Sequence, residues 1–175
     1  LDWSPDGSRA YYVDTSTQRI DVFDYDVDAG LTGRRTLVEI AESTGSPDGL
    51  TVDSEGHIWV ALYNGAAVHR YRPDGTLDGV IELPVSRPTA CTFGGADLGD
   101  LFITTSREKL PEGTEPLAGS VFHHRPGVVG RPAGGLAGYS YSKAMKAAGF
   151  TWTDAKLDAY LPAPRSLIDG TKMSY

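Results

Sequence analysis

Apolar and polar residues alternate along the first 138 residues in a pattern that predicts a repeated unit of β-strands. Three segments each combine a short apolar strand, a polar turn and a second apolar strand, over residues 1–14, 50–61 and 91–104. The first two turns contain Pro5-Asp6-Gly7 and Ser54-Glu55-Gly56, where glycine can supply the positive φ that a tight turn requires. We therefore expect a β-hairpin at each of the three places.

A third strand with alternating character follows each hairpin, over residues 19–25, 67–72 and 120–125, and a fourth follows the first two copies, over 35–40 and 78–83. Four strands recurring about every 40 to 50 residues are typical of the blades of a β-propeller. The predicted fold class is all-β, with about three C-terminal blades of a propeller. A self-contained β-sandwich has a similar number of strands, but it gives no reason for the repeat.

The pattern changes after residue 138. Residues 140–149 predict a short helix that ends at Gly149, and residues 151–161 predict a second helix that ends before Pro162 and Pro164. We expect a partial propeller over residues 1–138 and a short helical tail over 139–175. The boundary between them is predicted within residues 131–138.

The net charge of −7 argues against a nucleic-acid partner and against an anionic membrane, because both need basic patches. No apolar run approaches the roughly 20 residues of a membrane span. One cysteine, Cys91, excludes an internal disulfide and a cysteine-rich zinc site. The chain begins at Leu1 rather than methionine, so we expect a piece of a longer soluble protein, with cytoplasm and periplasm both open as its compartment.

Several segments of the predicted propeller occur in the order and spacing of one family. They are residues 1–14, 47–53 with 59–61, 63–65, 83–89, 93–95, 101–105 and 116–122. Over about residues 1–138, the chain resembles the gluconolactonase, regucalcin and luciferin-regenerating-enzyme family.

The resemblance implies a six-bladed propeller with a divalent metal, calcium or zinc, in its central channel. It implies hydrolysis of a small-molecule sugar lactone or a related ester. Of the family's metal ligands only an aspartate has a match here, Asp48, which would serve as ligand and as catalytic base. An asparagine ligand would lie just ahead of Leu1, and the others would lie in blades outside this chain. We therefore expect the isolated chain to be inactive and prone to aggregation.

Two alternative interpretations of this resemblance remain open, one for the function and one for Asp48. A non-catalytic, calcium-binding propeller of the regucalcin type would use the same site. Asp48 could also be a turn residue, because Pro-Asp-Gly is a common turn tripeptide and occurs again at residues 5–7 and 73–75. Asp48 differs from these two in its position, since it precedes a predicted inner strand rather than lying in a hairpin turn.

The tail resembles the C-terminal part of a class I cytochrome c over residues 139–175, and Met173 matches the axial haem ligand of that family. Covalent haem attachment needs a Cys-x-x-Cys-His sequence, and this chain has one cysteine, so a haem electron carrier is not expected. A natural fusion and an assembly error between two genes would both give this arrangement.

Other candidate residues favour ordinary structural roles. His123 and His124 are adjacent and point to opposite faces of a strand, so we expect them at the surface. His57 and His69 have no partner at a metal-binding spacing, and Cys91 is expected to be a buried apolar residue. Asp21, Asp24, Asp26 and Asp28 alternate as in a calcium loop but lack its glycine and terminal glutamate, which favours a solvated strand edge. Ser46 and Ser106 lack a nucleophile motif.

Overall fold

The computed structural model describes residues 1–95, 98–126, 142–151, 156 and 164–168. The chain divides into two compact units, Leu1–His124 and Arg125–Tyr175. The boundary predicted within residues 131–138 lies outside the described residues. No helix among the described residues is both long enough and apolar enough to cross a membrane.

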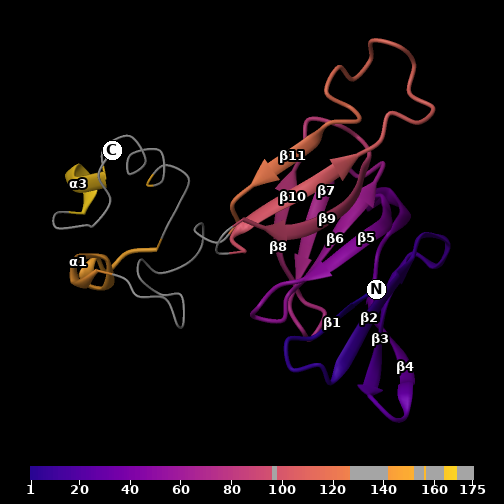
Figure 1. Ribbon diagram of the computed structural model, residues 1–175. Coiled ribbons are helices and arrows are strands. Elements are labelled where there is room, and N and C mark those ends of the chain that lie inside the picture. The colour runs from indigo at the N-terminus through magenta and orange to yellow at the C-terminus, as the bar shows by residue number, and fades with distance from the viewer. Residues whose placement is uncertain (96–97, 127–141, 152–155, 157–163, 169–175) are drawn as a thin grey trace. The chain divides into compact units, whose positions relative to one another are not determined.

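The first unit consists of three antiparallel sheets (Figure 1). The first sheet has the order β1-β2-β3-β4, the second β5-β6-β7-β8 and the third β9-β10-β11. The strands are β1 (Asp2–Trp3), β2 (Arg9–Asp14), β3 (Arg19–Asp26), β4 (Gly30–Glu39), β5 (Ser46–Val52), β6 (Ile58–Tyr63), β7 (Ala67–Tyr71), β8 (Leu77–Glu82), β9 (Pro88–Gly94), β10 (Asp100–Thr105) and β11 (Val121–His124). Short 3-10 turns, η1 (Thr15–Thr17) and η2 (Glu42–Thr44), connect β2 to β3 and β4 to β5.

The three sheets share one pairing register, which confirms the repeat predicted from the sequence. Trp3 pairs with Ala10 in the first sheet, Val52 with Ile58 in the second and Phe93 with Leu101 in the third. The second and third strands of each sheet also pair in the same register: Tyr11 pairs with Val22, Trp59 with Arg70 and Phe102 with His123. The hairpin turn of residues 5–7 also forms, since the Gly7 amide donates to the Ser4 carbonyl at 2.8 Å.

Two separate apolar cores join the sheets in series. The first core packs Tyr11, Ile20 and Val22 of the first sheet against the second sheet, and the second core packs Trp59, Ala61 and Val68 of the second sheet against the third. The facing residues of the first core are Leu50, Ile58, Val60, Leu62 and Tyr71, and those of the second are Cys91, Leu101 and Ile103. A sandwich has one core between two sheets, so this arrangement rules out the sandwich and is that of consecutive propeller blades.

The first strands of successive sheets also contact each other: β1 contacts β5, and β5 contacts β9. The Asp2 carboxylate of β1 accepts hydrogen bonds from the Thr51 hydroxyl at 3.0 Å and the Val52 amide at 2.8 Å. These are the inner strands of the blades, so β5 has an inner strand of another sheet on each side.

The second unit contains α1 (Lys143–Ala147) and α3 (Pro164–Leu167). The Ser142 side chain caps α1 by accepting from the Met145 amide at 3.1 Å, so the helix begins later than the predicted residue 140. Gly149 follows α1 with φ of +69°, as predicted for the end of this helix. The second predicted helix lies almost wholly outside the described residues. Pro164 begins a helix that the sequence did not predict, because proline fits the first position of a helix as well as it ends one.

Candidate functional site

Asp48 lies within β5, which begins at Ser46 and therefore earlier than the predicted start near Leu50. Pro47 pairs with Leu62, and the next pair joins Leu50 to Val60, so Asp48 and Gly49 together face one residue of β6. This is a β-bulge, in which two residues of one strand lie opposite one residue of its neighbour. A bulge bends the strand and changes the direction of its side chains. Asp48 is therefore held on an inner strand, and the alternative that it occupies a hairpin turn is wrong.

Gly49 brings this bulge into close contact with the third sheet. A Cβ atom added at Gly49 would lie 2.5 Å from the Ala90 Cβ, 2.7 Å from the Ala90 Cα and 2.8 Å from the Thr89 carbonyl oxygen. Real Cβ atoms do not approach backbone this closely, so only glycine fits between β5 and β9. Because glycine fits there, β5 packs closely on β9, and this packing fixes the backbone that carries Asp48.

The Asp48 carboxylate is half-buried and has no compensating partner. Among the residues that the structure describes, no hydrogen-bond donor and no cation contacts it, and burial raises the pKa of this carboxyl above its ordinary value of 3.8. The pKa values of the aspartates in the other two Pro-Asp-Gly sequences are lowered instead. The Ser4 hydroxyl with the Ser8 amide and hydroxyl lowers the pKa of Asp6 to about 2, and the Thr76 amide lowers that of Asp74. A partly buried carboxylate without a donor fits a cation ligand.

Loops at the same end of the second sheet join the neighbouring sheets by polar contacts. The Gln18 amide donates to the Ser46 hydroxyl at 3.1 Å, next to the start of β5. The Arg87 Nε donates to the Asn64 side-chain oxygen at 3.0 Å, and the Arg87 guanidinium lies 5.4 Å from the centre of the Tyr63 ring. Sequence reasoning missed Gln18 and Arg87, because a single polar residue in a loop carries no pattern that singles it out.

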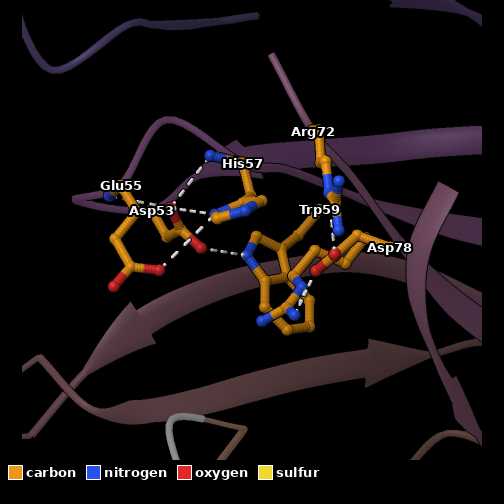
Figure 2. Close-up of polar contacts among 7 residues, drawn as sticks. Asp53, Glu55, His57, Trp59, Arg72 and Asp78 are labelled. Atoms are coloured by element: carbon orange, nitrogen blue, oxygen red, sulfur yellow. Dashed lines mark hydrogen bonds and ion pairs between the residues drawn. The ribbon is translucent and has the colours of Figure 1, made fainter. Parts of the chain in front are cut away.

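A second polar cluster lies beyond the other end of β5, where Asp53, Glu55 and His57 place ligand atoms within 4.8 Å of one another (Figure 2). The prediction that His57 has no partner at a metal-binding spacing is wrong, since its Nδ1 lies 3.3 Å from Asp53 and 3.7 Å from Glu55. Asp53 Oδ1 accepts from the amides of Glu55 and His57, both at 2.9 Å, and Oδ2 accepts from the Trp59 indole at 2.9 Å. These bonds hold the hairpin turn together, and the same three side chains could also hold a metal ion.

The other candidates take structural roles. Asp21 was expected at a solvated edge, but it is buried, because the guanidinium groups of Arg19 and Arg34 contact it and cover it. Cys91 is buried as expected, and burial raises the pKa of its thiol to about 12. His69 is buried with its Nδ1 at 3.0 Å from the Tyr71 hydroxyl.

The two adjacent histidines are exposed as expected, and His123 contacts Asp100 at 2.8 Å. Met173, the candidate haem ligand, lies outside the described residues.

The packing of the sheets makes the first unit part of a β-propeller with a carboxylate on an inner strand. A family model, the SMP-30/Gluconolactonase/LRE-like region, matches residues 1–107. Human regucalcin is 37% identical over 147 residues, which cover 81% of this chain and 48% of that protein. The chain therefore belongs to the SMP-30/gluconolactonase/LRE-like family and spans about half the length of the curated relatives it matches.

Solved structures agree with this assignment. A calcium-binding protein, regucalcin, from Agrobacterium tumefaciens matches with a TM-score of 0.66 and 33% identity, over 70% of this chain and 43% of that one. A gluconolactonase from Xanthomonas campestris matches with a TM-score of 0.52 and 33% identity, over 59% of this chain and 33% of that one. These comparisons give no support to a cytochrome c segment in the tail, which stays a prediction.

Proposed function

We propose that this chain is part of a lactone hydrolase that holds a divalent cation, calcium or zinc, with Asp48 as one ligand. The observation that carries the proposal is the Asp48 carboxylate on the β5 bulge, half-buried and without a donor or a cation among the described residues. A cation would offset the cost of keeping this charge partly buried. The gluconolactonase among the matched structures supports the choice of a lactone as the substrate.

Asp48 has two roles in this proposal. As a carboxylate it supplies a hard oxygen ligand, which calcium and zinc both accept. The same carboxylate would act as the general base that accepts the proton of the attacking water. A bound cation would polarise the lactone carbonyl and stabilise the oxyanion that develops during hydrolysis.

One ligand is too few for tight cation binding, so we expect the isolated chain to be inactive. The test is complementation of this chain with the half of human regucalcin that it does not match, since the match covers 48% of that protein. Hydrolysis of a sugar lactone is followed with calcium or zinc present, after gel filtration has shown that the two parts form a complex.

The matched variants are Asp48→Asn and Asp74→Asn, which make the same change in two Pro-Asp-Gly sequences. We expect turnover in the complex, its loss with Asp48→Asn and its retention with Asp74→Asn. Turnover that survives Asp48→Asn would contradict the proposal. A complex that binds the cation through Asp48 without turnover would favour the second candidate, a non-catalytic calcium-binding propeller, which the regucalcin relatives support.

A further inference from the structure

The first strands of the second and third sheets, β5 and β9, carry their residues at equivalent positions. Val52 of β5 and Phe93 of β9 hold the same place in the register of their hairpins. Four residues before them stand Asp48 in β5 and Thr89 in β9. Thr89 therefore occupies in the third sheet the position that Asp48 occupies in the second.

Burial on both sides of these two residues supports the equivalence. The residues that precede them, Pro47 and Pro88, are both fully buried. Two residues further on, Leu50 packs in the first core and Cys91 in the second, so each packs against the sheet before its own. The two positions therefore agree in packing as well as in register.

The β-bulge at Asp48 is repeated at Thr89. The residues on either side of Thr89 pair with Thr105 and Thr104, which are consecutive in β10, so Thr89 is the extra residue of β9. A bulge changes the direction of the side chain that it carries, and bulges are common next to active sites. Both strands thus hold a polar side chain at the same irregularity.

The two bulges lie in close contact. Gly49, which shares the bulge of Asp48, lies so near to β9 that a Cβ atom added to it would be 2.8 Å from the Thr89 carbonyl oxygen. The contact lies between two sheets that the second core joins, so it is internal to the chain. Because inner strands surround the central channel of a propeller, Asp48 and Thr89 stand at one level of that channel on neighbouring strands.

The Thr89 hydroxyl has the capacity to accept a further hydrogen bond. Its oxygen lies 2.8 Å from the Thr104 hydroxyl oxygen, and the Thr104 hydroxyl donates to the Ala90 carbonyl at 3.4 Å. With the Thr104 proton on that carbonyl, Thr89 donates its own proton to Thr104. A hydroxyl has one proton and two lone pairs, so the Thr89 oxygen keeps lone pairs that accept from an O–H group.

The second sheet has no hydroxyl at the position that Thr104 occupies in the third. Ala61 is the residue of β6 that lies opposite Asp48 and Gly49 in the bulge, and alanine has no polar group to offer a carboxylate. The two bulges thus present two hydrogen-bond acceptors to the channel, the carboxylate of Asp48 and the hydroxyl oxygen of Thr89.

We propose that Thr89 positions the water that attacks the lactone. This inference rests on the proposed function, in which Asp48 accepts one proton of that water. The Thr89 oxygen accepts a hydrogen bond from the other proton, so the water is held at both hydrogens and its lone pair is directed at the lactone carbonyl.

Thr89 neither gains nor loses a proton in this step. The water oxygen bonds to the carbonyl carbon while the first proton passes to Asp48. The ring C–O bond then breaks, and Asp48 returns this proton to the leaving alkoxide. The second proton stays on the carboxyl group that forms, so the product is a hydroxy acid.

The test uses the complex of this chain with the unmatched half of human regucalcin and follows hydrolysis of glucono-δ-lactone with calcium present. Thr89→Val removes the hydroxyl and keeps the branched shape, so we expect kcat to fall about tenfold, the size of one lost hydrogen bond, at unchanged KM. Thr89→Ala is expected to have the same effect, and Thr89→Ser, which keeps the hydroxyl, retains most of the parent rate.

The matched control is Thr92→Val, which makes the same change three residues further along β9. We expect it to leave kcat unchanged, and gel filtration checks that each variant forms the complex as the parent chain does. A fall in kcat that Thr92→Val shares would be a general effect on β9 and would overturn the proposal. A rise in KM at constant kcat would overturn it as well, because Thr89 would then contact the lactone rather than the water.

The two proposals fail in different ways. An active parent complex that Thr89→Val leaves unchanged overturns the role of Thr89 and leaves the proposed function standing. An inactive parent complex overturns the proposed function, and the role of Thr89 falls with it.

Discussion

The Asp2 carboxylate accepts a hydrogen bond from the Val52 amide at 2.8 Å and so joins the first strands of two successive sheets. A second bond, from the Thr51 hydroxyl at 3.0 Å, uses the same Asp2 oxygen, while the other oxygen accepts from the Trp3 amide. The bonds to Val52 and Thr51 are partly buried, so water does not fully replace them when the carboxylate is removed.

Asp2→Ala is therefore expected to lower the free energy of unfolding by about 1–3 kcal/mol, because it leaves the Val52 amide without its acceptor. Urea unfolding followed by tryptophan fluorescence measures the loss. Asp28→Ala is the control, since Asp28 is exposed in a turn and its expected effect is within about 0.5 kcal/mol. Equal effects of the two substitutions would show that the Asp2 bonds add nothing.

Gly49→Ala is expected to destabilise the first unit by about 1–3 kcal/mol, because its Cβ would meet the Ala90 Cα and the Thr89 carbonyl at under 3 Å. Gly79→Ala makes the same change within β8, where the nearest atom to the new Cβ is the Arg70 Nε at 3.7 Å. We expect this control to be neutral or slightly stabilising, since alanine restricts the unfolded chain. Thermal unfolding of both variants measures the change in stability. An unchanged stability of Gly49→Ala would contradict the close approach of β5 to β9.

Asp53→Ala is expected to cost about 1–3 kcal/mol of stability, because it removes the acceptor of two turn amides and of the Trp59 indole. Glu55→Gln, on the exposed side of the same turn, is the control and is expected to have a much smaller effect. Thermal unfolding with and without zinc completes the test. A large zinc stabilisation that Asp53→Ala abolishes and Asp48→Asn preserves would instead make this cluster a metal site.

Cys91 is expected to resist alkylation in the folded protein at pH 8. Burial raises the pKa of its thiol to about 12, so the reactive thiolate is scarce, and the side chain is also covered. Labelling with iodoacetamide followed by mass spectrometry measures the modified fraction, and the same chain in urea is the control that reacts. Rapid labelling without denaturant would show that the second core opens.

The strands and their grouping into sheets could be predicted from the sequence because alternation and repeated turns are local signals. The segments 1–14, 50–61 and 91–104 were each predicted to contain two strands, and their second strands are β2, β6 and β10, which end within two residues of the predicted ends. The repeat also placed Asp48 ahead of an inner strand. These features depend on spacing along the chain, which the sequence displays directly.

The rest depends on contacts between distant residues. The bulge at Asp48 arises from the register of β5 on β6, and the need for Gly49 arises from Ala90 in another sheet. Asp21 looked like a surface residue because Arg34, which covers it, stands thirteen positions later. The partner of His57 was missed because Asp53 reaches it only after the turn has folded.

The central claim is that Asp48 is an uncompensated carboxylate kept for a ligand rather than a turn residue. Burial raises the pKa of Asp48 in the folded state above 3.8. Between pH 3.8 and the folded pKa, the folded state holds a proton that the unfolded state has released. The free energy of unfolding therefore falls as pH rises through the folded pKa. The Asp74 pKa is lowered, so its stabilising effect is present above pH 3.8 and is lost as pH falls through the folded pKa.

The most direct measurement is the free energy of unfolding of Asp48→Asn and Asp74→Asn between pH 3 and 8. We predict that Asp48→Asn is more stable than the parent chain at neutral pH and that this gain disappears near pH 3. Asp74→Asn is predicted to be less stable at neutral pH. A loss of stability in Asp48→Asn that matches the loss in Asp74→Asn would contradict the account.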